Sequence, residues 1–422
     1  MTTDSRTFRL GDVCSKIGSG ATPRGGSKVY LDSADVSLIR SQNVFNDGFK
    51  AAGLVYLSDE AAKSLEGVSV KSGDVLLNIT GDSVARVCQA PESILPARVN
   101  QHVAIIRPDP KVLDAEYLRY VLITPEFQAI LLSYASSGAT RNALTKGMIE
   151  GLEITAPGDV GEQKRIARIL GALDDKIELN RRMNQTLEAI ARALFKSWFV
   201  DFDPVRAKAE GRDTGLPKHI ADLFPDRFVD SDLGEIPEGW SVTVIGNVAA
   251  NFDSRRVPLS KREREKRPGR YPYYGAASIM DYIDEYLFDG VYLLLGEDGT
   301  VTDSEGRASS QYVWGKFWTN NHAHVLKGKN GLSTEVLYLH FKQANISSYV
   351  TGAVQPKLNQ RNLNAIPLVR ACDLVLECFD SLVFPLFERI RSNSEEMSVL
   401  QELRDSLLPR LLSGELSDTE AA

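Results

Sequence analysis

The residues with the clearest chemical potential lie in a basic run from Arg255 to Arg270. This run contains eight basic and two acidic side chains, a local charge of +6 in a chain whose net charge is −7. Tyr271, Tyr273 and Tyr274 follow its last residue directly. Because arginine and lysine neutralise phosphates and aromatic rings pack against nucleic acid, this combination favours contact with DNA over a merely solvated helix face.

The first 160 residues show no comparable excess of positive charge, with 16 basic and 18 acidic side chains. Their candidates are instead scattered polar residues of the types that pair with base edges, since arginine, asparagine and glutamine can bond bidentately to purines. For the whole chain, the predicted DNA-binding residues are Thr22, Arg24, Lys28, Arg40, Gln42, Asn78, Arg86, Arg141, Asn142, Arg255, Arg256, Lys261, Arg262, Arg264, Arg267, Arg270, Tyr273, Tyr274, Gln355 and Lys357.

No pattern in the sequence predicts catalysis. The glycine-rich run at 20–27 lacks the lysine of a phosphate-binding loop, and no Asn-Pro-Pro-aromatic tetrapeptide of amino-methyltransferases occurs. His322 and His324 should point to opposite faces of a strand, so we expect structural histidines and no metal site. Glu297 and Asp298 have no nucleophile nearby in sequence and are interpreted as turn residues. We expect no catalytic residue, no metal and no cofactor in this chain.

Long helices must position these loops. From Gln163 to Val200 an apolar seam recurs in steps of four and three, which predicts a helix of about 57 Å that needs a partner helix. A second seam starts at Phe379, and a shift of 213 residues superposes the two, so that Asn180 coincides with Asn393. The apolar pattern of the second seam is interrupted at Arg404, where the neighbouring Leu403 could occupy the seam position instead. Pro385 should kink the second helix or mark its start.

The segments before the two helices repeat one plan. Five matches recur in the same order: Val244–Val248 with Arg9–Val13, Gly290–Leu295 with 73–77, Asn320–His322 with Asn100–His102, Glu335–Leu339 with the helix containing Tyr117 and Leu118, and Gly352 and Leu358 with Gly138 and Leu144. Between the copies, residues 201–238 are poor in apolar side chains and predict an extended connector with one helical turn near His219–Phe224. The chain is therefore interpreted as a tandem duplication, whose pseudo-two-fold symmetry suits a bipartite target.

Composition is that of a soluble protein of several domains, with 422 residues, 43% apolar and 25% charged. The four cysteines form no close pair, which favours reduced thiols in a cytoplasmic location. Met1 to Arg9 has no apolar core of a signal peptide, and no apolar run is long enough to span a bilayer. We expect no membrane association.

In these features the chain resembles the specificity subunits of type I restriction-modification systems. Besides the duplicated layout, the motifs that carry the resemblance are Gly20-Ala21-Thr22-Pro23, Gly161–Ala167, Leu173–Asn180, Ser197–Pro204, Leu233–Trp240 and Leu407–Leu416. The resemblance covers essentially the whole chain. One departure is that Gly352, Gln355 and Leu358 fit the family's loop only loosely, and the first half has Thr140-Arg141-Asn142 at that place.

Together, duplication and resemblance imply an α+β fold with two similar mixed α/β target-recognition domains, joined by two long helices that form an antiparallel coiled coil. The expected segments are the recognition domains at 1–160 and 239–372, the long helices at 161–203 and 373–414, the connector at 204–238 and a tail at 415–422.

The resemblance further implies a non-catalytic subunit, each of whose domains reads one half of a bipartite sequence in double-stranded DNA while the helices set the spacing. It implies two methyltransferase subunits and restriction/translocase subunits as partners, and assigns S-adenosylmethionine, ATP and magnesium to them. Three alternatives stay open: a targeting subunit of another defence system, a DNA-modifying enzyme with fused recognition modules, and a scaffold whose globules bind something other than DNA.

Overall fold

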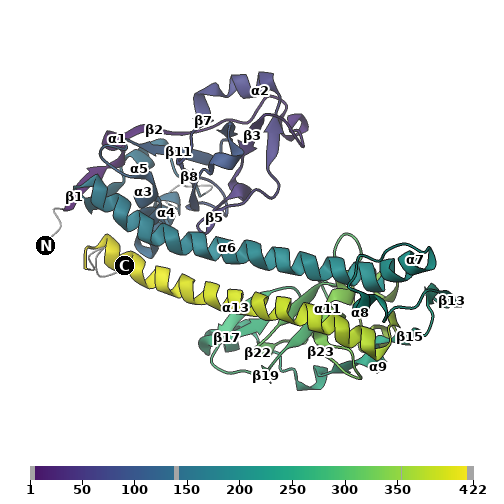
Figure 1. Ribbon diagram of the computed structural model, residues 1–422. Coiled ribbons are helices and arrows are strands. Elements are labelled where there is room, and N and C mark those ends of the chain that lie inside the picture. Colours follow the sequence, from purple (N-terminus) through teal and green to yellow (C-terminus); the bar gives the residue numbers. More distant parts are fainter. Residues whose placement is uncertain (1–4, 137–141, 353, 416–422) are drawn as a thin grey trace. The chain divides into compact units, whose positions relative to one another are not determined.

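The computed structural model describes residues 5–136, 142–352 and 354–415. The chain forms two compact units, residues 1–178 with 397–422 (unit 1) and residues 179–396 (unit 2). Two helices of 40 residues each, α6 (Val160–Phe199) and α13 (Asp373–Leu412), continue from one unit into the other. Each unit therefore combines a mixed α/β domain with a stretch of both helices, drawn in teal and yellow in Figure 1.

The central layer of unit 1 is a four-stranded antiparallel sheet buried on both faces. Its strands, in order, are β2 (Cys14–Ser19), β11 (Val103–Pro108), β8 (Val75–Asn78) and β9 (Val87–Gln89). In β8, Val75 and Leu77 pack toward the helices, whereas Leu76 packs on the opposite side. All three side chains are fully buried. An uninterrupted apolar run is what a strand covered on both faces requires.

A second sheet covers one face of this layer. Its strands, in order, are β6 (Val55–Leu57), β3 (Val36–Ile39), β10 (Ala97–Val99) and β7 (Ser69–Val70). β3 and β10 run parallel, and the other neighbours run antiparallel. Helix α2 (Asp59–Ser64) packs on the outer face of this sheet, and a short hairpin, β4 (Val44–Phe45) with β5 (Gly48–Phe49), lies beside β9.

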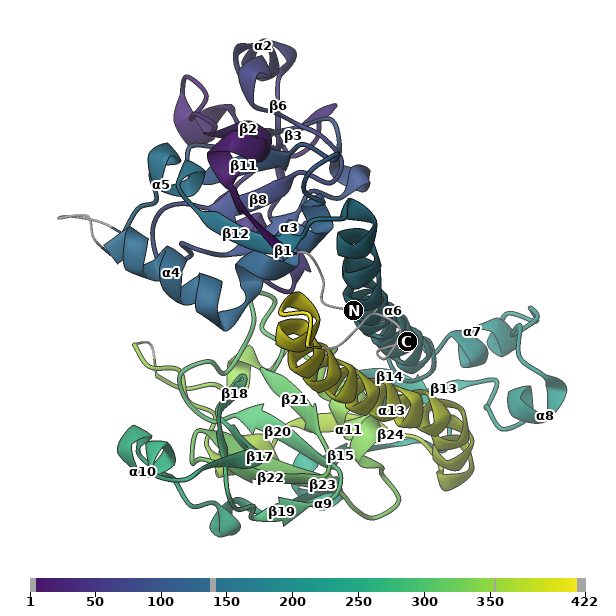
Figure 2. The same ribbon diagram turned by 90° about the vertical axis from the view of Figure 1, so that its left-hand side faces the viewer.

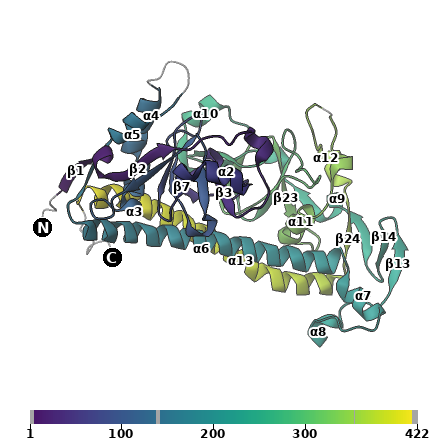
Figure 3. The same ribbon diagram turned by 90° about the horizontal axis from the view of Figure 1, so that it is seen from above.

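Helix α3 (Ala115–Ile123) covers the other face of the central sheet and separates it from α6, along which it lies in Figure 3. The carboxylate of Asp114 caps α3 by accepting from the backbone N–H groups of Glu116 and Tyr117. Apolar side chains recur at helical spacing throughout 114–133, which predicts one helix, but the segment forms two. Pro125 cannot donate within a helix and instead opens α4 (Pro125–Ser136). The remaining elements are α1 (Leu10–Val13), α5 (Lys146–Glu150) and the antiparallel pair β1 (Ser5–Arg9) and β12 (Glu153–Pro157).

Unit 2 repeats the strand topology of unit 1 (Figure 2). Its central sheet has the order β16 (Ala249–Asn251), β23 (Ala323–Gly328), β20 (Tyr292–Gly296), β21 (Ser310–Val313). Its second sheet has the order β18 (Ile279–Ile283), β17 (Pro268–Tyr274), β22 (Lys316–Thr319), β19 (Phe288–Asp289), again with one parallel pair, β17 and β22. β15 (Ser241–Val244) pairs with β24 (Pro367–Arg370) as β1 pairs with β12.

The helices of unit 2 also correspond to those of unit 1. Three occupy equivalent places: α9 (Ile245–Val248) that of α1, α11 (Thr334–Phe341) that of α3, and α12 (Gln360–Asn364) that of α5. The helix beside the second sheet differs between the units. Helix α2 comes after strand β6 along the chain in unit 1, whereas helix α10 (Lys261–Glu265) comes before strand β17 in unit 2. The predicted architecture of two similar domains joined by two long helices is confirmed.

One predicted match between the copies, Gly290–Leu295 with 73–77, pairs six residues with five and leaves its register open. Residue pairs across β11 and β8, and across β23 and β20, make Asn78 equivalent to Gly296, and hence Leu77 equivalent to Leu295. Pairing the two segments from their first glycines, Gly73 and Gly290, would instead match Leu77 with Leu294. Leu294 and Leu295 occupy opposite faces of β20, since Leu295 packs toward the helices and Leu294 packs toward the second sheet. Runs of leucine carry no periodic signal, so the shift of one residue is invisible in sequence.

Stretches of α6 and α13 run antiparallel within each unit. In unit 1, Ile166 and Leu170 pack in one cluster with Leu408 and Leu411. In unit 2, the amide of Asn393 donates to Asn184 Oδ1 at 2.8 Å. Asn180 and Asn393 are both completely buried, as expected for polar seam positions. None of the helices in the described ranges has an apolar stretch that could cross a membrane.

Two details of the second seam differ from expectation. Leu403 is 43% exposed and does not enter the seam. Arg404 itself occupies that position, because Asp174 of α6 lies opposite and accepts from its Nη1 at 2.8 Å. Pro385 does not mark the start of α13, which is continuous from Asp373. Its ring is tolerated on an exposed face, at the cost of one backbone hydrogen bond.

The connector is folded and not extended. It contains α7 (Asp203–Ala209), α8 (Lys218–Ala221) and a hairpin of β13 (Phe228–Ser231) with β14 (Gly234–Pro237). Its few apolar side chains are concentrated where they can be buried: Val205, Ile220, Phe224 and Ile236 are all at most 8% exposed. Val205, Ile220 and Phe224 belong to the core cluster that contains Trp198 and Trp240. The sequence predicts an extended connector because the average apolarity of 201–238 is low, and an average does not show that a few apolar side chains anchor the segment.

Candidate nucleic-acid interface

In unit 1, polar loops meet where β8 ends and β11 begins. They surround an open concavity of about 420 Å³, lined by Ser41, Gln42, Thr80, Gly81, Asp82, Ser83, Arg86 and His102. Hydroxyls, an amide, a guanidinium and an imidazole are the groups that contact phosphates and base edges.

A tight loop between β8 and β9 positions Arg86. Asn78 accepts at its backbone oxygen from Ala85 N at 2.9 Å and donates its own N–H to the Arg86 carbonyl at 2.9 Å. Ala85 adopts a left-handed φ of 73°, which closes the loop within a few residues. The Arg86 guanidinium then lies 4.6 Å from the centroid of the Phe45 ring. The charge is thus held on an aromatic face beside the concavity.

The other predicted residues of this region have mixed roles. Gln42 is exposed and donates to the Gly53 carbonyl at 3.2 Å, as does Arg40. Asn78 is fully buried and donates to the Ser41 carbonyl at 2.8 Å, so it supports the loops and cannot contact a ligand. Asn142 is exposed, and its carbonyl accepts from Gly81 N at 3.3 Å. The predicted Arg141 lies outside the described residues.

The same place in unit 2 carries a similar set of loops. The backbone bonds around His102 recur around His322, since Ile79 N donates to the His102 carbonyl and Glu297 N donates to that of His322. His102 Nδ1 contacts the Thr80 hydroxyl at 2.5 Å, and His322 Nδ1 contacts the carboxylate of Asp298. A histidine therefore stands at the same position of both copies, half-buried in unit 1 and exposed in unit 2, and its ring contacts polar side chains in each.

The loop beside His322 presents Gln355 and Lys357, both predicted and both exposed. Thr351 and Lys357 exchange two backbone hydrogen bonds of 2.9 and 2.7 Å, so the loop closes on itself. Gly352 has a φ of +87°, and a Cβ there would lie 2.3 Å from the Gln355 carbonyl, so this turn requires glycine. Lys357 Nζ lies 3.5 Å from Glu297, which links the loop to the end of β20.

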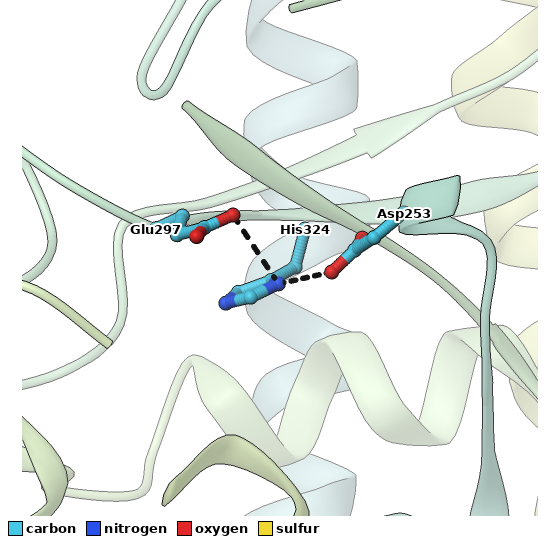
Figure 4. Close-up of side chains that lie close together, drawn as sticks. All are labelled: Asp253, Glu297 and His324. Carbon is cyan, nitrogen blue, oxygen red and sulfur yellow. Dashed lines mark hydrogen bonds and ion pairs between the residues drawn. The ribbon is translucent and has the colours of Figure 1, made fainter. Parts of the chain in front are cut away.

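Beneath this surface, unit 2 buries a cluster of charged groups (Figure 4). His324 is 1% exposed, and its Nδ1 lies 2.5 Å from Asp253 Oδ2 and 3.8 Å from Glu297 Oε2. Burial tends to raise the pKa of Asp253, but hydrogen bonds from His324, Asn251 and the Val325 N–H outweigh it, so the pKa is lowered and the carboxylate stays ionised.

Three potential metal ligands thus lie together, with ligand atoms of Asp253, Glu297 and His324 within 4.8 Å of one another. The charges in this cluster are already matched, however. His324 Nε2 donates to the Leu358 carbonyl at 2.6 Å, and Arg256 Nη1 binds Glu297 at 2.8 Å while its Nη2 lies 3.6 Å from Asp253. With a guanidinium neutralising both carboxylates, we interpret the cluster as an ion-pair network that supports Arg256 and the Leu358 loop.

The basic side chains between Arg255 and Arg270 are largely engaged in contacts within the protein. Arg264 pairs with Asp281 at 3.2 Å, and Arg267 pairs with Asp284 at 2.9 Å. Arg255 donates to the Leu287 carbonyl and lies over Phe288, and Arg270 stacks on Tyr271. Lys261 and Arg262 are exposed on α10; among the described residues, the Arg262 side chain has no hydrogen bond or ion pair.

Two predicted tyrosines lie inside unit 2. Tyr273 is 0% exposed, and its hydroxyl accepts from Leu259 N at 2.9 Å, so it cannot contact DNA in this fold. Tyr274 is half-buried and packs edge-on against Phe317 at 5.7 Å. Strand β17 passes between two packed layers, which buries tyrosines that a linear basic-aromatic pattern would expose.

Thr22, Arg24 and Lys28 are exposed on the segment between β2 and β3, and none of them lines the concavity. Sequence reasoning missed His102, Thr80, His322 and Asp298, which the structure places at the loops of both units. A signal existed, because the match of Asn100-Gln101-His102 with Asn320-Asn321-His322 is visible in sequence. In both segments the asparagine side-chain oxygen accepts a hydrogen bond from the backbone N–H of the histidine, at 3.0 Å in unit 1 and 2.9 Å in unit 2.

Comparison with known proteins identifies similar chains. The family model "Type I restriction modification DNA specificity domain" matches residues 3–189 and 237–369. The HindI type I restriction enzyme specificity subunit of Haemophilus influenzae is 26% identical over 98% of this chain and 100% of its own length. The MjaIX specificity subunit of Methanocaldococcus jannaschii is 27% identical over 95% of this chain and 91% of its own.

A solved structure shares the fold. The crystal structure of a type I restriction-modification S subunit from M. genitalium aligns with a TM-score of 0.59 and covers 97% of this chain and 96% of its own. Its sequence identity is 14%. At that identity the likeness supports the architecture, while the family assignment depends on the matched sequence.

Proposed function

Because the chain belongs to the type I restriction modification DNA specificity family, we propose that it is the non-catalytic subunit that recognises a bipartite sequence in double-stranded DNA. Each unit reads one half of the target, and neither performs chemistry. The observation that carries this proposal is the repetition of one strand topology in two units, with polar loops gathered at the same end of the central sheet in both.

In unit 1, the reading groups are Gln42 and Arg86, whose side chains line the concavity and can bond base edges in the major groove. In unit 2, they are Gln355 and Lys357 on the loop beside His322. The exposed cations on α10, Lys261 and Arg262, hold phosphates and add affinity without selecting a base. The two surfaces differ in residues, which suits two unlike half-sites.

The long helices set the separation of the half-sites, and they bind other subunits of the complex, two methyltransferase subunits and restriction/translocase subunits. Apolar side chains exposed along them support this docking, among them Leu179 and Ile190 of α6 and Val399 of α13, which are 53%, 44% and 62% exposed. S-adenosylmethionine, ATP and magnesium act in those partners, and the complex works in the cytoplasm.

A direct test is to co-express the chain with its methyltransferase subunits and map the methylated bases across the host genome. A bipartite consensus with a spacer of constant length is expected. Gln42→Ala and Gln355→Ala should each relax the consensus in a different half, by about 1–3 kcal/mol per base contact. Methylation without sequence preference, or relaxation of both halves by either variant, would refute the assignment of one half-site to each unit.

The role of the helices has its own test. Seven residues inserted at Asn184 of α6, together with seven inserted at Asn393 of α13, should preserve the seam. One heptad adds about 10.5 Å, so the spacer should lengthen by about 3 base pairs while both half-sites stay the same. An unchanged spacer in the methylated sites would show that the helices do not set the distance.

A further inference from the structure

A half-buried carboxylate in unit 1, 21% exposed, holds three helices together. Asp174 of α6 accepts from Arg119 Nη1 of α3 and from the Tyr120 hydroxyl, both at 2.8 Å, through its Oδ2. Its Oδ1 accepts from Arg404 Nη1 of α13, also at 2.8 Å. Burial would raise the pKa of Asp174, but these cationic and hydroxyl partners lower it overall, so the group is a fixed negative charge.

From Arg119 the chain of contacts continues into the recognition domain. The Arg119 side chain is 9% exposed and lies over the Tyr120 ring at 4.5 Å. Its second terminal nitrogen, Nη2, donates to the backbone carbonyl of Asn46 at 3.3 Å. Asn46 belongs to the turn between β4 and β5, directly after Phe45. One guanidinium therefore bridges the helix pair and this turn.

Asn46 then holds the loop that presents Arg86. Its Oδ1 accepts from Val87 N at 2.8 Å, and its Nδ2 donates to Gln128 Oε1 at 3.2 Å. Gln128 in turn donates to the Ala85 carbonyl at 2.9 Å. The residues on both sides of Arg86 are thus anchored by Asn46, directly or through Gln128, while the Arg86 guanidinium stacks on the ring of Phe45.

We propose that Asp174, Arg119 and Asn46 are positioning residues that set the base selectivity of unit 1 by fixing the Arg86 loop to the helix pair, without touching DNA. This inference rests on the proposed function. A bidentate contact to a base discriminates only when the side chain is held in one orientation. A relay of charge-assisted hydrogen bonds centred on the buried Arg119 supplies that constraint. The selectivity of unit 1 therefore depends on a seam residue of α13.

The experiment uses the full chain assembled with its methyltransferase subunits and selects bound sequences from a random DNA pool. Gln42→Ala first identifies which half-site unit 1 reads. Asp174→Asn should then lower discrimination at that half-site by about 2- to 30-fold, the usual range for residues coupled to a distant site. Discrimination at the other half-site should be unchanged, and it serves as an internal control.

Two further variants separate positioning from general damage. Asp175→Asn makes the same chemical change at the adjacent exposed residue of α6 and should leave both half-sites intact. Arg404→Leu completes the apolar seam, so the helix pair is retained while one partner of Asp174 is removed. It should reproduce a weaker form of the Asp174→Asn phenotype, and it carries the test if Asp174→Asn does not fold.

A double-mutant cycle decides whether the contacts act as one relay. Asp174→Asn combined with Asn46→Ala should reduce discrimination no further than the stronger single variant, since both interrupt the same chain of bonds. Additive effects, equal loss at both half-sites or no change in a folded variant would overturn the inference. A wild-type complex that selects no bipartite sequence would instead refute the proposed function on which it depends.

Discussion

Replacing Phe224 by alanine tests whether the connector is part of the structure of unit 2. Phe224 is 2% exposed, and its ring meets Trp198 of α6 edge-on, with centroids 4.9 Å apart and an interplanar angle of 87°. Loss of a buried phenylalanine costs about 3–5 kcal/mol, of which the aromatic pair contributes about 0.5–1.5 kcal/mol. For a unit of this size, each kcal/mol lowers the thermal midpoint by about 2–4 °C, so we expect a fall of about 6–20 °C.

Scanning calorimetry of the full chain measures this shift, and limited proteolysis reports whether residues 201–238 become accessible. Phe384→Ala provides the matched control, because Phe384 lies on α13 with 47% of its surface exposed and its removal should cost about 0.5 kcal/mol or less. If Phe224→Ala and Phe384→Ala shift the midpoint equally, or if wild-type protein is cleaved rapidly within 201–238, the connector does not pack as the structure indicates.

Three further predictions concern stability. Asn393 is buried with its Oδ1 unpaired, so Asn393→Leu combined with Asn184→Leu should raise the free energy of unfolding by about 1–3 kcal/mol, and a fall in urea titration would refute the packing of this seam. Pro385→Ala should add about 1–3 kcal/mol by restoring a helix hydrogen bond on an exposed face, and an unchanged thermal midpoint would contradict the continuous α13. Burial lowers the pKa of His340 from 6.5 to about 4, so between these pH values the unfolded chain binds more protons than the folded chain. The free energy of unfolding should therefore fall by up to about 3 kcal/mol as the pH drops from 6.5 to 4. His340→Phe should remove this dependence on pH.

The helix seams illustrate how much a period can predict. Spacing alone located both helices, since a 40-residue amphipathic helix has only one way to bury its stripe. It also placed Asn180 and Asn393 in the seam. The partner of Arg404 was not predictable, because Asp174 lies 230 residues away in the chain and their pairing depends on the antiparallel register. Opposite charges are common, and sequence does not say which of them meet.

For the candidate DNA surface, the sequence predicted less than it did for the helices. Composition singled out the run from Arg255 to Arg270, yet Arg264 and Arg267 bind carboxylates on the neighbouring strand β18 and on the residues after it. A local net charge counts residues but not their partners, and the acidic groups that pair with these arginines follow 17 residues later, within reach only once β17 and β18 pair.

The amino-acid sequence by itself determined the duplication, the two long helices, the family and the absence of a recognisable catalytic motif, because these depend on repeated patterns along one chain. Tertiary structure decided the register of β20, the burial of Tyr273, the folding of the connector and the gathering of Gln42, Arg86 and His102 around one concavity. Each of these features depends on which distant segments of the chain contact one another. A contact between two loops produces no periodic pattern in the sequence of either loop, so it cannot be predicted from periodicity.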